Sequence, residues 1–499
     1  MNKIVFEDQI ILYWDKEWDL ANGIEYTILL DGKEVGKTVK THFTFENLQS
    51  DKEYKLAVYR LGDNDEKVYL FDQAVRTPKA KNRIDVSKPP YNAVGDGKTL
   101  NTKAIQKAMD DCTESDCVYI PSGVFMTGAL DMHSNMELYV DKGGVLQGTA
   151  QVKDYTPKIW SRFEGEEMEC YRSLLNIGKL DHTAGYTTEN IVIRGKGAIL
   201  GGGVALCNAV CALETKLLKD FLENNKELVA SCERPDTIPK RRRGRLLNIS
   251  NCKNVIVHGL EIGMGPSWNI HFIYSKDVIT CGCYIRSQGV SNGDGWDPDS
   301  SEDCVCFNND FATHDDGIAI KSGKNPEGNK INRPTKNIRV FDCRGRNSVA
   351  IGSELSGGIE NVYVWDCDYQ ESNLGVNIKT TTKRGGYVKN IKVKDCRFVG
   401  IGIRTKYGCN NDGESSGCLT EIENIHFQDI YFYGRKPEHV ICPENYRIPI
   451  YFEGFDGEGN EIKNVTVKNC VLEKRPDGKT QDIYIKNVKG LTLENVKFQ

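Results

Sequence analysis

From about residue 118 onward, short runs of alternating apolar and polar residues recur behind an asparagine or aspartate. Counting the related runs at Asp277 and Asp303, successive starts from residue 254 are 23 to 40 residues apart. Period-2 alternation is typical of strands that bury one face, and a single coil of such strands cannot bury that face alone. Stacked coils can, so the pattern predicts an all-β, right-handed parallel β-helix. The clearest runs are NIVIRG, NVIVHG, NIRVFD, NVYVWD, NIKVKD, NIHFQD and NVTVKN, starting at residues 190, 254, 337, 361, 390, 424 and 464.

Residues 1–79 have a different pattern, with alternating segments such as EYTILLDGKEVGKT, HFTFENL and YKLAVYRL between turn residues. This pattern predicts a small β-sandwich domain. The stretch LQSDKEYKLAVYRL and the closing VRTP resemble a fibronectin type III domain, with Trp14 in the core and Tyr54 in the corner position. A spacer or packing role and a sugar-binding role both remain open for this domain.

Residues 80–92 are interpreted as a linker, since Pro89 and Pro90 break regular structure there. The β-helix domain then covers residues 93–499. It begins with a predicted helix that Thr102 caps and that closes the open end of the solenoid. One face of this helix carries Ala104, Ile105 and Ala108.

The bulk composition excludes some classes of function. The chain has 499 residues, of which 27% are charged and 39% hydrophobic, and its formal net charge is −5. A nucleic-acid-binding protein would need a broad basic surface, so we expect no nucleic-acid partner. No apolar run of roughly 18 residues occurs, so we expect no membrane span. The sequence leaves the oligomeric state open.

The 18 cysteines follow the repeat rather than a disulfide framework. Several stand directly after Asn or Asp at the end of a strand-like run, which predicts reduced thiols stacked inside the solenoid. No zinc-like CxxC and histidine spacing is present, so we predict no metal site and no cofactor. The first apolar stretch is interrupted by Glu7, Asp8 and Asp15, and we therefore expect no signal peptide and a cytoplasmic location. The cysteines at the repeated position are Cys252, Cys343, Cys367, Cys396 and Cys470.

The densest polar stretch is SNGDGWDPDSSEDCVCFNNDFATHDDGIAIKSGKN, residues 291–325. Asp294 and Asp315 are 21 residues apart, about one coil, so we expect them on neighbouring coils with Asp316 beside Asp315. Crowded carboxyl groups acquire different pKa values, as glycoside hydrolysis requires of its acid and its base. From the residues alone, a calcium site or a solvated acidic turn remains an alternative.

Several motifs resemble glycoside hydrolase family 28, the polygalacturonase family, in the family's order from about residue 90 to 430. They are GDGKTLNTKAIQKAM, IPSGVFMTGAL, GRLLNISNCKNVIVHGLEIGMGPSWNIH, NGDGWDPDS, HDDGIAIKSGKN, AIGSELSGG and NIKTTTKRGGYVKNI. The resemblance implies inverting hydrolysis in which Asp315 is the general acid, while Asp294 and Asp316 activate water. It also implies that Asn292 orients Asp294, and that Asp297 is mainly a structural turn residue.

The chain departs from the family's motifs at two positions. Asn347 stands where the family has the histidine of Gly-His-Gly, and Asn377 where it has the arginine of Arg-Ile-Lys. Lys379, which the resemblance implies contacts a substrate carboxylate, is kept. Loss of the arginine removes a bidentate carboxylate clamp. We predict that Asn292, Asn347, Asn377, Lys379 and Arg384 form the substrate-binding set, with Arg384 as a candidate to compensate.

Other residues allow more than one interpretation. Arg346 could supply positive charge or be structural, Tyr407 is a candidate substrate contact, and Trp296 could stack on a sugar or fill the coil. His271 is interpreted as a core histidine or one that supports the site from behind. The run KRRRGR at 240–245 could attract an anionic glycan or form a solvated loop.

The resemblance implies a hydrolase of acidic pectic oligosaccharides that contain galacturonate. We expect exo action, because a long insert such as residues 203–243 could block one end of the cleft and a cytoplasmic enzyme would meet imported oligomers rather than polymer. A rhamnogalacturonan hydrolase or a rhamnosidase of the same family is an alternative, because Asn347 and Asn377 alter the binding motifs. A pectate-lyase-like enzyme and a non-catalytic carbohydrate-binding β-helix are alternatives from other classes.

Overall fold

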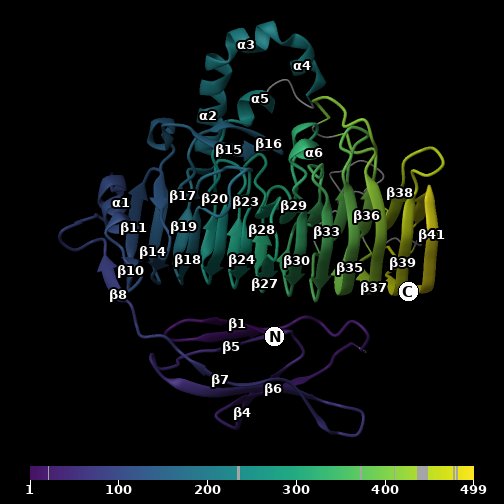
Figure 1. The fold of residues 1–499 in the computed structure, drawn as a ribbon, viewed down its shortest axis with the longest axis horizontal. Coiled ribbons are helices and arrows are strands. Elements are labelled where there is room, and N and C mark those ends of the chain that lie inside the picture. The colour runs from purple at the N-terminus through teal and green to yellow at the C-terminus, as the bar shows by residue number, and fades with distance from the viewer. Residues whose placement is uncertain are drawn as a thin grey trace. The chain divides into compact units, whose positions relative to one another are not determined.

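The chain divides into two compact units, Met1–Arg83 and Ile84–Gln499 (Figure 1). No helix in the part of the chain that is described is long and apolar enough to cross a membrane. The computed structural model describes residues 1–20, 22–232, 237–370, 374–408, 411–434, 448–475, 478 and 482–499.

The N-terminal unit consists of two antiparallel sheets around one hydrophobic core. Trp14 is buried in that core, as the sequence predicts, and the Gln49 N–H donates a 2.8 Å hydrogen bond to the Tyr54 hydroxyl. A tyrosine tied to the backbone a few residues upstream is a feature of immunoglobulin-like sandwiches. The fibronectin type III assignment itself stays a prediction. The sheets have the orders β1 (Asn2–Val5), β2 (Ile10–Tyr13), β5 (His42–Phe45) and β4 (Lys33–Thr38), β3 (Tyr26–Leu30), β6 (Glu53–Leu61), β7 (Lys67–Arg76).

The large unit is the predicted right-handed parallel β-helix, with three sheets whose strands follow one another coil by coil. Within the described residues one sheet has 13 strands. Its first strand, β8, lies in the segment 80–92 that the sequence predicts as a linker. The strands are β8 (Asn82–Asp85), β10 (Asp116–Ile120), β13 (Glu137–Val140), β18 (Thr188–Gly195), β21 (Cys252–His258), β24 (Lys276–Cys281), β27 (Val305–Phe307), β30 (Thr335–Phe341), β33 (Ile359–Trp365), β35 (Tyr387–Phe398), β37 (Glu421–Phe432), β39 (Ile462–Leu472) and β41 (Val488–Phe498).

The other two sheets have eight and 11 strands in the described ranges. The eight-stranded sheet contains β9 (Asp96–Leu100), β11 (Gly123–Thr127), β14 (Gly144–Gly148), β19 (Ala198–Leu200), β22 (Glu261–Gly263), β25 (Tyr284–Arg286), β28 (Asp310–Ala312) and β31 (Arg344–Gly345). The 11-stranded sheet contains β12 (Leu130–Met132), β17 (Leu175–Gly178), β20 (Leu247–Ser250), β23 (Ile270–Ile273), β26 (Trp296–Asp299), β29 (Ile318–Ile320), β32 (Val349–Ile351), β34 (Val376–Lys379), β36 (Ile401–Arg404), β38 (Ile450–Glu453) and β40 (Ile483–Lys486).

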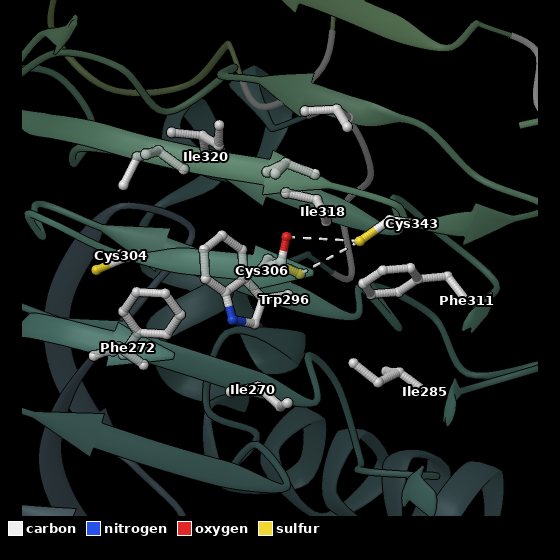
Figure 2. Close-up of a cluster of buried hydrophobic side chains, with 14 of the residues drawn as sticks. Ile270, Phe272, Ile285, Trp296, Cys304, Cys306, Phe311, Ile318, Ile320 and Cys343 are labelled. Carbon is white, nitrogen blue, oxygen red and sulfur yellow. Dashed lines mark hydrogen bonds between the residues drawn. The ribbon is translucent and has the colours of Figure 1, made fainter. Parts of the chain in front are cut away.

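The inward-facing side chains of stacked coils form one continuous core. Figure 2 shows part of it, where Phe272, Trp296, Ile318 and Ile320 gather inside the tube. Trp296 is fully buried, and its indole N–H donates to the Thr280 hydroxyl at 3.0 Å, so the interpretation as a coil-filling residue is confirmed. Each such large apolar side chain contributes about 1.5–3 kcal/mol when it is fully buried.

The cysteines behave as interior side chains. The 16 cysteines in the described ranges are all free, and the five at the repeated position are all buried. Cys306 and Cys343 lie on neighbouring coils with their sulfur atoms 4.0 Å apart (Figure 2). The prediction of stacked structural thiols is therefore confirmed for these positions.

The asparagines that begin the repeats form a ladder along the 13-stranded sheet. Their backbone φ angles are positive, which Asn tolerates better than most residues. Each side-chain Nδ2 donates to the Oδ1 of the preceding coil at 2.7–3.2 Å, so the turn interpretation is confirmed and extended. Asp277 and Asp303 take two places in the ladder, which consists otherwise of Asn135, Asn190, Asn254, Asn337, Asn361, Asn390, Asn424 and Asn464.

Helix α1 (Thr102–Asp110) closes the N-terminal end of the solenoid as predicted, since Ile105, Ala108 and Met109 belong to the core. The predicted capping role of Thr102 is wrong. Its hydroxyl accepts from the Gly128 N–H at 2.7 Å, because the helix begins at Thr102 itself and that side chain turns toward the sheet.

Two insertions project from the same side of the β-helix in Figure 1. The first is an antiparallel hairpin, β15 (Ile159–Phe163) and β16 (Glu166–Cys170). The second contains α2 (Gly203–Leu217), α3 (Lys219–Asn224), α4 (Lys226–Ser231) and α5 (Thr237–Lys240). The remaining short helices are η1 (Val152–Tyr155) and α6 (Glu327–Ile331).

Candidate active site

The candidate site lies on the outer face of the 11-stranded sheet. Successive side chains of a strand point to opposite faces of the sheet. Ile318 and Ile320 of β29 therefore enter the core, while Lys321, directly after the strand, points outward. Parallel register places the outward side chains of adjacent coils next to one another, as with Lys379 and Arg404. A row of polar groups on this face can therefore meet one ligand.

The two aspartate motifs lie on neighbouring coils, which confirms the prediction from their spacing. Trp296 of β26 is in register with Ile318 of β29, and the Gly295 N–H donates to the Asp316 carbonyl at 3.0 Å. Asp294, Asp315 and Asp316 line a single pocket, together with Asn292, Lys321, Glu354 and Lys379 among others.

Asp294 is almost completely buried, with an exposed fraction of 3%. Its Oδ2 lies 3.3 Å from the Lys321 ammonium, while Oδ1 has no hydrogen-bond donor among the described residues. Burial raises the pKa of Asp294 well above its usual range, and Lys321 opposes that effect more than any other group. Burial also raises the pKa of Asp297 to about 7. The Asp297 Oδ1 lies 3.5 Å from the Lys321 nitrogen.

Asp315 and Asp316 are adjacent but have different partners. Asp316 accepts from Lys379 at 2.7 Å and from the Ser348 hydroxyl at 3.2 Å. The Asp315 carboxylate accepts a hydrogen bond from the Asp316 N–H at 3.0 Å. Burial and the neighbouring Asp316 charge both raise the pKa of Asp315. The pair can therefore divide the roles of acid and base.

Asn292 and Lys379 lie in the pocket, as the sequence predicts of binding residues. The Asn292 Oδ1 accepts from Arg243 at 2.6 Å, which fixes the side chain two residues before Asp294. The Lys379 nitrogen lies 5.2 Å from the centroid of the Tyr407 ring, and Tyr407 also lines the pocket.

Asn347 and Asn377 are placed differently from the prediction, since neither lines the pocket. The Asn347 amide donates to the carbonyls of Thr313 and Asp315, each at 2.6 Å, and so braces the turn that carries Asp315. The Asn377 Oδ1 accepts from Arg404 at 3.1 Å. Because a guanidinium only donates, the Asn377 carbonyl must face Arg404.

Arg384 does not reach the pocket. It is fully buried and donates to the Asn325 side chain at 2.6 Å and to the Ser353 carbonyl at 2.9 Å. Its guanidinium joins loops of neighbouring coils. Arg384 therefore lies away from the pocket in which the sequence predicts a substrate contact. Arg346 is likewise outside the pocket lining, and His271 is completely buried behind it.

The basic run 240–245 is structural rather than a solvated, glycan-attracting loop. Arg243 and Arg245 are fully buried, and Arg241 is ion-paired with Glu164 at 2.5 Å and with Asp412 at 2.8 Å. Composition alone suggests exposure for such a run, but Glu164 of the β15–β16 turn and Asp412, in the segment after β36, supply the opposing carboxylates.

The sequence interpretation missed Lys321, Trp268, Glu164 and Glu354, all of which line the pocket. The Lys321 nitrogen lies 4.7 Å from the centroid of the Trp268 ring and 3.8 Å from Glu354. Lys321 stands in the quoted motif HDDGIAIKSGKN, where continued alternation after Ile320 already indicates an outward side chain. Glu354 and Trp268 carry no comparable signal.

The β15–β16 hairpin forms one wall of the pocket through Glu164. Arg162 of β15, two residues before Glu164, donates to Asp299 at 2.8 Å, and the side chains of Arg162 and Asp299 are fully buried. Lys324 reinforces the wall through Asp412 at 3.0 Å. This network fixes the hairpin to the coil that carries the catalytic motif.

The calcium-loop alternative is not supported by this geometry. Asp294 and Asp297 face Lys321, and Asp299 faces Arg162, so protein cations already occupy the positions beside these carboxylates. In the described part of the chain, no group of three or more His, Cys, Asp or Glu side chains is arranged to hold a metal ion.

Three carboxyl groups with different partners, in one pocket on the outer face of a parallel β-helix, fit a glycoside hydrolase. A family model described as "Glycosyl hydrolases family 28" matches residues 116–441. The chain belongs to this family.

Individual relatives extend the comparison. The chain is 25% identical over 457 residues to an exo-poly-alpha-D-galacturonosidase of Dickeya chrysanthemi, covering 81% of this chain and 75% of the relative. An exopolygalacturonase structure from Thermotoga maritima matches with a TM-score of 0.68 at 25% identity, covering 84% of this chain and 92% of that one. A family 28 exopolygalacturonase structure from Yersinia enterocolitica shares the fold with a TM-score of 0.82 at 20% identity, covering 99% and 96%.

Proposed function

We propose that the protein is an inverting glycoside hydrolase that removes sugars from the end of galacturonate-containing pectic oligosaccharides. The observation that carries the proposal is the unequal environment of two carboxyl groups in one pocket. Burial and a neighbouring negative charge raise the pKa of Asp315, while Lys379 and Ser348 bind the Asp316 carboxylate. One group is suited to hold a proton and the other to accept one.

In the proposed reaction, Asp315 donates its proton to the glycosidic oxygen as the bond to the anomeric carbon breaks. Asp294 and Asp316 orient a water molecule on the opposite face of the sugar, and one of them takes its proton as the oxygen attacks. Inverting enzymes need roughly 6.5–9.5 Å between acid and base, because the water lies between them. Asn292 and Asn347 are positioning residues, since they fix the segments that carry Asp294 and Asp315.

Galacturonate recognition is assigned to Lys379. Its ammonium binds Asp316 in the pocket and has capacity for further acceptors, so a sugar carboxylate can share it. Tyr407 beside it offers an aromatic face for a sugar ring. The names of the Dickeya and Thermotoga relatives support a galacturonate substrate.

Exo action is supported by the hairpin wall. Glu164 bounds the pocket, and buried ion pairs from Arg162 and Arg241 hold the hairpin in place. A fixed wall limits how far a polymer can extend past the cleaved bond, which favours release of a terminal sugar. The relatives named above as exo-acting enzymes support this part of the proposal.

A rhamnogalacturonan hydrolase is the second candidate, and one contact favours it. Arg404 donates to the Asn377 carbonyl, and Asn377 lies outside the pocket lining, so the position of the family's arginine offers no guanidinium clamp to a sugar carboxylate. This candidate predicts a neutral sugar next to the cleaved bond.

A cytoplasmic location is also proposed. Its support is the set of 16 free cysteines in the described ranges, most of them inside the solenoid. A cytoplasmic enzyme would meet imported oligosaccharides rather than polymer, which agrees with exo action.

The test is product analysis on oligogalacturonides and rhamnogalacturonan oligosaccharides, with ultraviolet absorbance followed in parallel. Saturated galacturonate monosaccharide released from the first panel supports the leading proposal. Cleavage confined to the second panel would transfer the assignment to the rhamnogalacturonan candidate. Unsaturated products would indicate a lyase, and no product from any glycan would overturn the enzymatic assignment.

A further inference from the structure

A buried lysine stands among more carboxylates than it can neutralise. The Lys321 nitrogen lies 3.3 Å from Asp294 Oδ2, 3.5 Å from Asp297 Oδ1 and 3.8 Å from Glu354 Oε2. Its exposed fraction is 4%, so water does little to screen these interactions. Lys321 is therefore a strong local influence on which carboxyl group in the pocket holds a proton.

We propose that Lys321 is the positioning residue that opposes protonation of Asp294 and orients it as a base, by binding its Oδ2. This inference rests on the proposed hydrolase function and assigns the lysine a role in it. Lys321 touches the carboxylate rather than the reacting sugar, so its effect is exerted through Asp294.

The contacts select Asp294 among the three neighbours. Lys321 donates a hydrogen bond to Asp294 at 3.3 Å, and its nitrogen lies farther from Asp297, at 3.5 Å. Glu354 is the most distant of the three. The geometry thus gives Asp294 one oxygen held by Lys321 and a second, buried oxygen that has no donor among the described residues.

The lysine itself is held in a fixed position. Its ammonium lies over the Trp268 ring, whose centroid is 4.7 Å away, and Trp268 stacks on Phe163 of the hairpin at 4.7 Å. The indole face attracts the desolvated ammonium, and this attraction offsets part of the hydration that the lysine loses on burial. The hairpin therefore supports the base as well as forming the wall.

The electrostatic setting includes charged groups from several coils. Burial raises the pKa of Asp294, and the charges of Asp297, Asp315 and Asp316 raise it further, while Lys321 lowers it. Without the lysine, burial and these three negative charges would all favour the protonated form of Asp294. The charged or titratable groups that interact with Lys321 or Asp294 are Asp297, Glu354, Asp315, Asp316, Asp299 and His271.

The test compares the pH dependence of kcat/KM in wild type, Lys321→Gln and Lys321→Arg. A base must be ionised, so activity rises with pH as Asp294 loses its proton. Removing a cation at this distance should move the acidic limb upward by ~1–3 pH units. Arg retains the charge and should return the limb toward its wild-type position. A limb that stays in place in Lys321→Gln, whatever the level of activity, would overturn the proposal.

Lys394→Gln is the matched control. Lys394 is also buried beside a carboxylate, with its nitrogen 3.8 Å from Asp429, but it lies on β35 of the 13-stranded sheet. Its replacement should lower stability without moving the acidic limb. An equal shift in this control would show that loss of a buried lysine acts nonspecifically, and would also overturn the proposal.

A second measurement separates this inference from the hydrolase assignment. Urea unfolding at pH 7 is compared for wild type, Lys321→Gln, Asp294→Asn and the double variant. If the two groups are coupled, Lys321→Gln lowers the unfolding midpoint less in the Asp294→Asn background than in wild type. Equal shifts would contradict the coupling. This result stands even if no glycan is hydrolysed, in which case the proposed function alone fails.

Discussion

Single residues of the pocket differ in the groups that surround their carboxylates, and this difference decides their expected roles. Asp316 has a lysine and a hydroxyl as partners, and Asp315 has the backbone N–H of its neighbour. Their adjacency in the chain therefore does not make them equivalent. The acid can be told from the base by its contacts rather than by its position.

Asp315→Asn should reduce kcat by about 10²–10⁴-fold, because an amide cannot donate the proton that the leaving oxygen requires. Turnover of an oligogalacturonide measures the effect, and the urea midpoint checks that the variant is folded. Asp310→Asn is the control, since Asp310 lies five residues away on β28 with a side chain that is 54% exposed, and it should retain activity. Near-normal turnover by Asp315→Asn would remove this residue from the mechanism.

Asp277→Asn should stabilise the protein at pH 7. Asp277 stands in the asparagine ladder beside Asn254, but a carboxylate cannot donate to the preceding coil as an amide does. The new hydrogen bond should contribute about 0.5–1.5 kcal/mol to the free energy of unfolding, measured with urea.

The pH dependence of that gain follows from the direction of the pKa shift. Burial raises the pKa of Asp277, so the wild type loses stability as pH rises from about 4 through the raised value. The advantage of Asn should thus be larger at pH 7 than below pH 4. Asp303→Asn is the contrasting variant, because Asp303 already accepts from Asn337 and pairs with Lys276 at 3.0 Å. A stabilisation by Asp303→Asn equal to that by Asp277→Asn would contradict the account.

Residue roles could be predicted from the sequence where the repeat sets the geometry. The 21-residue spacing of Asp294 and Asp315 is about one coil, and parallel register turns that spacing into proximity. Arg384 had no such constraint, because its partners Asn325 and Ser353 come from loops whose paths the spacing does not determine. Asn347 likewise uses its amide on local carbonyls, a contact that no motif encodes.

Among the elements, the β15–β16 hairpin depends on buried charge rather than on sheet pairing with the solenoid. Arg162 donates to Asp299 and to the Ser300 hydroxyl at 2.9 Å, and it also binds the Tyr274 hydroxyl. Burial tends to raise the pKa of Asp299, but the arginine and His271 hold it at about 2. The hairpin and the end of strand β26 are thereby joined by a buried ion pair.

Arg162→Leu should destabilise the protein by about 3–5 kcal/mol, because it leaves Asp299 buried without its main cation. Arg344→Leu provides a matched loss of an arginine–aspartate pair on the surface, where both side chains are more than half exposed. That control should cost under about 1 kcal/mol. Urea unfolding compares the two, and similar losses would show that the buried pair does not fix the hairpin.

The strands could be predicted individually, whereas the insertions could not. Alternation with period 2 and a leading asparagine mark the strands of the 13-stranded sheet directly. The hairpin and helices α2–α5 interrupt the repeat and pack through ion pairs from distant segments, such as Arg241 with Asp412. Their place against the pocket follows only from the folded structure.

For the whole molecule, the sequence predicted the solenoid because every coil needs its neighbours to bury an apolar face. Stacking then gives one long outer face on which each coil contributes a few side chains. The pocket uses this property, since its acid, its bases and Lys379 come from the coils of β26, β29 and β34 in the same sheet. The identity of the sugar depends on a few contacts on that face and not on the fold.

Proton NMR of the anomeric region during the first turnovers of an α-linked oligogalacturonide tests the central claim most directly. Direct attack by water from the face opposite Asp315 predicts that galacturonate monosaccharide appears first as the β-anomer, with the α-anomer following by mutarotation. Initial release of the α-anomer would mean retention through a covalent intermediate. That result would contradict the assignment of Asp294 and Asp316 as groups that activate water.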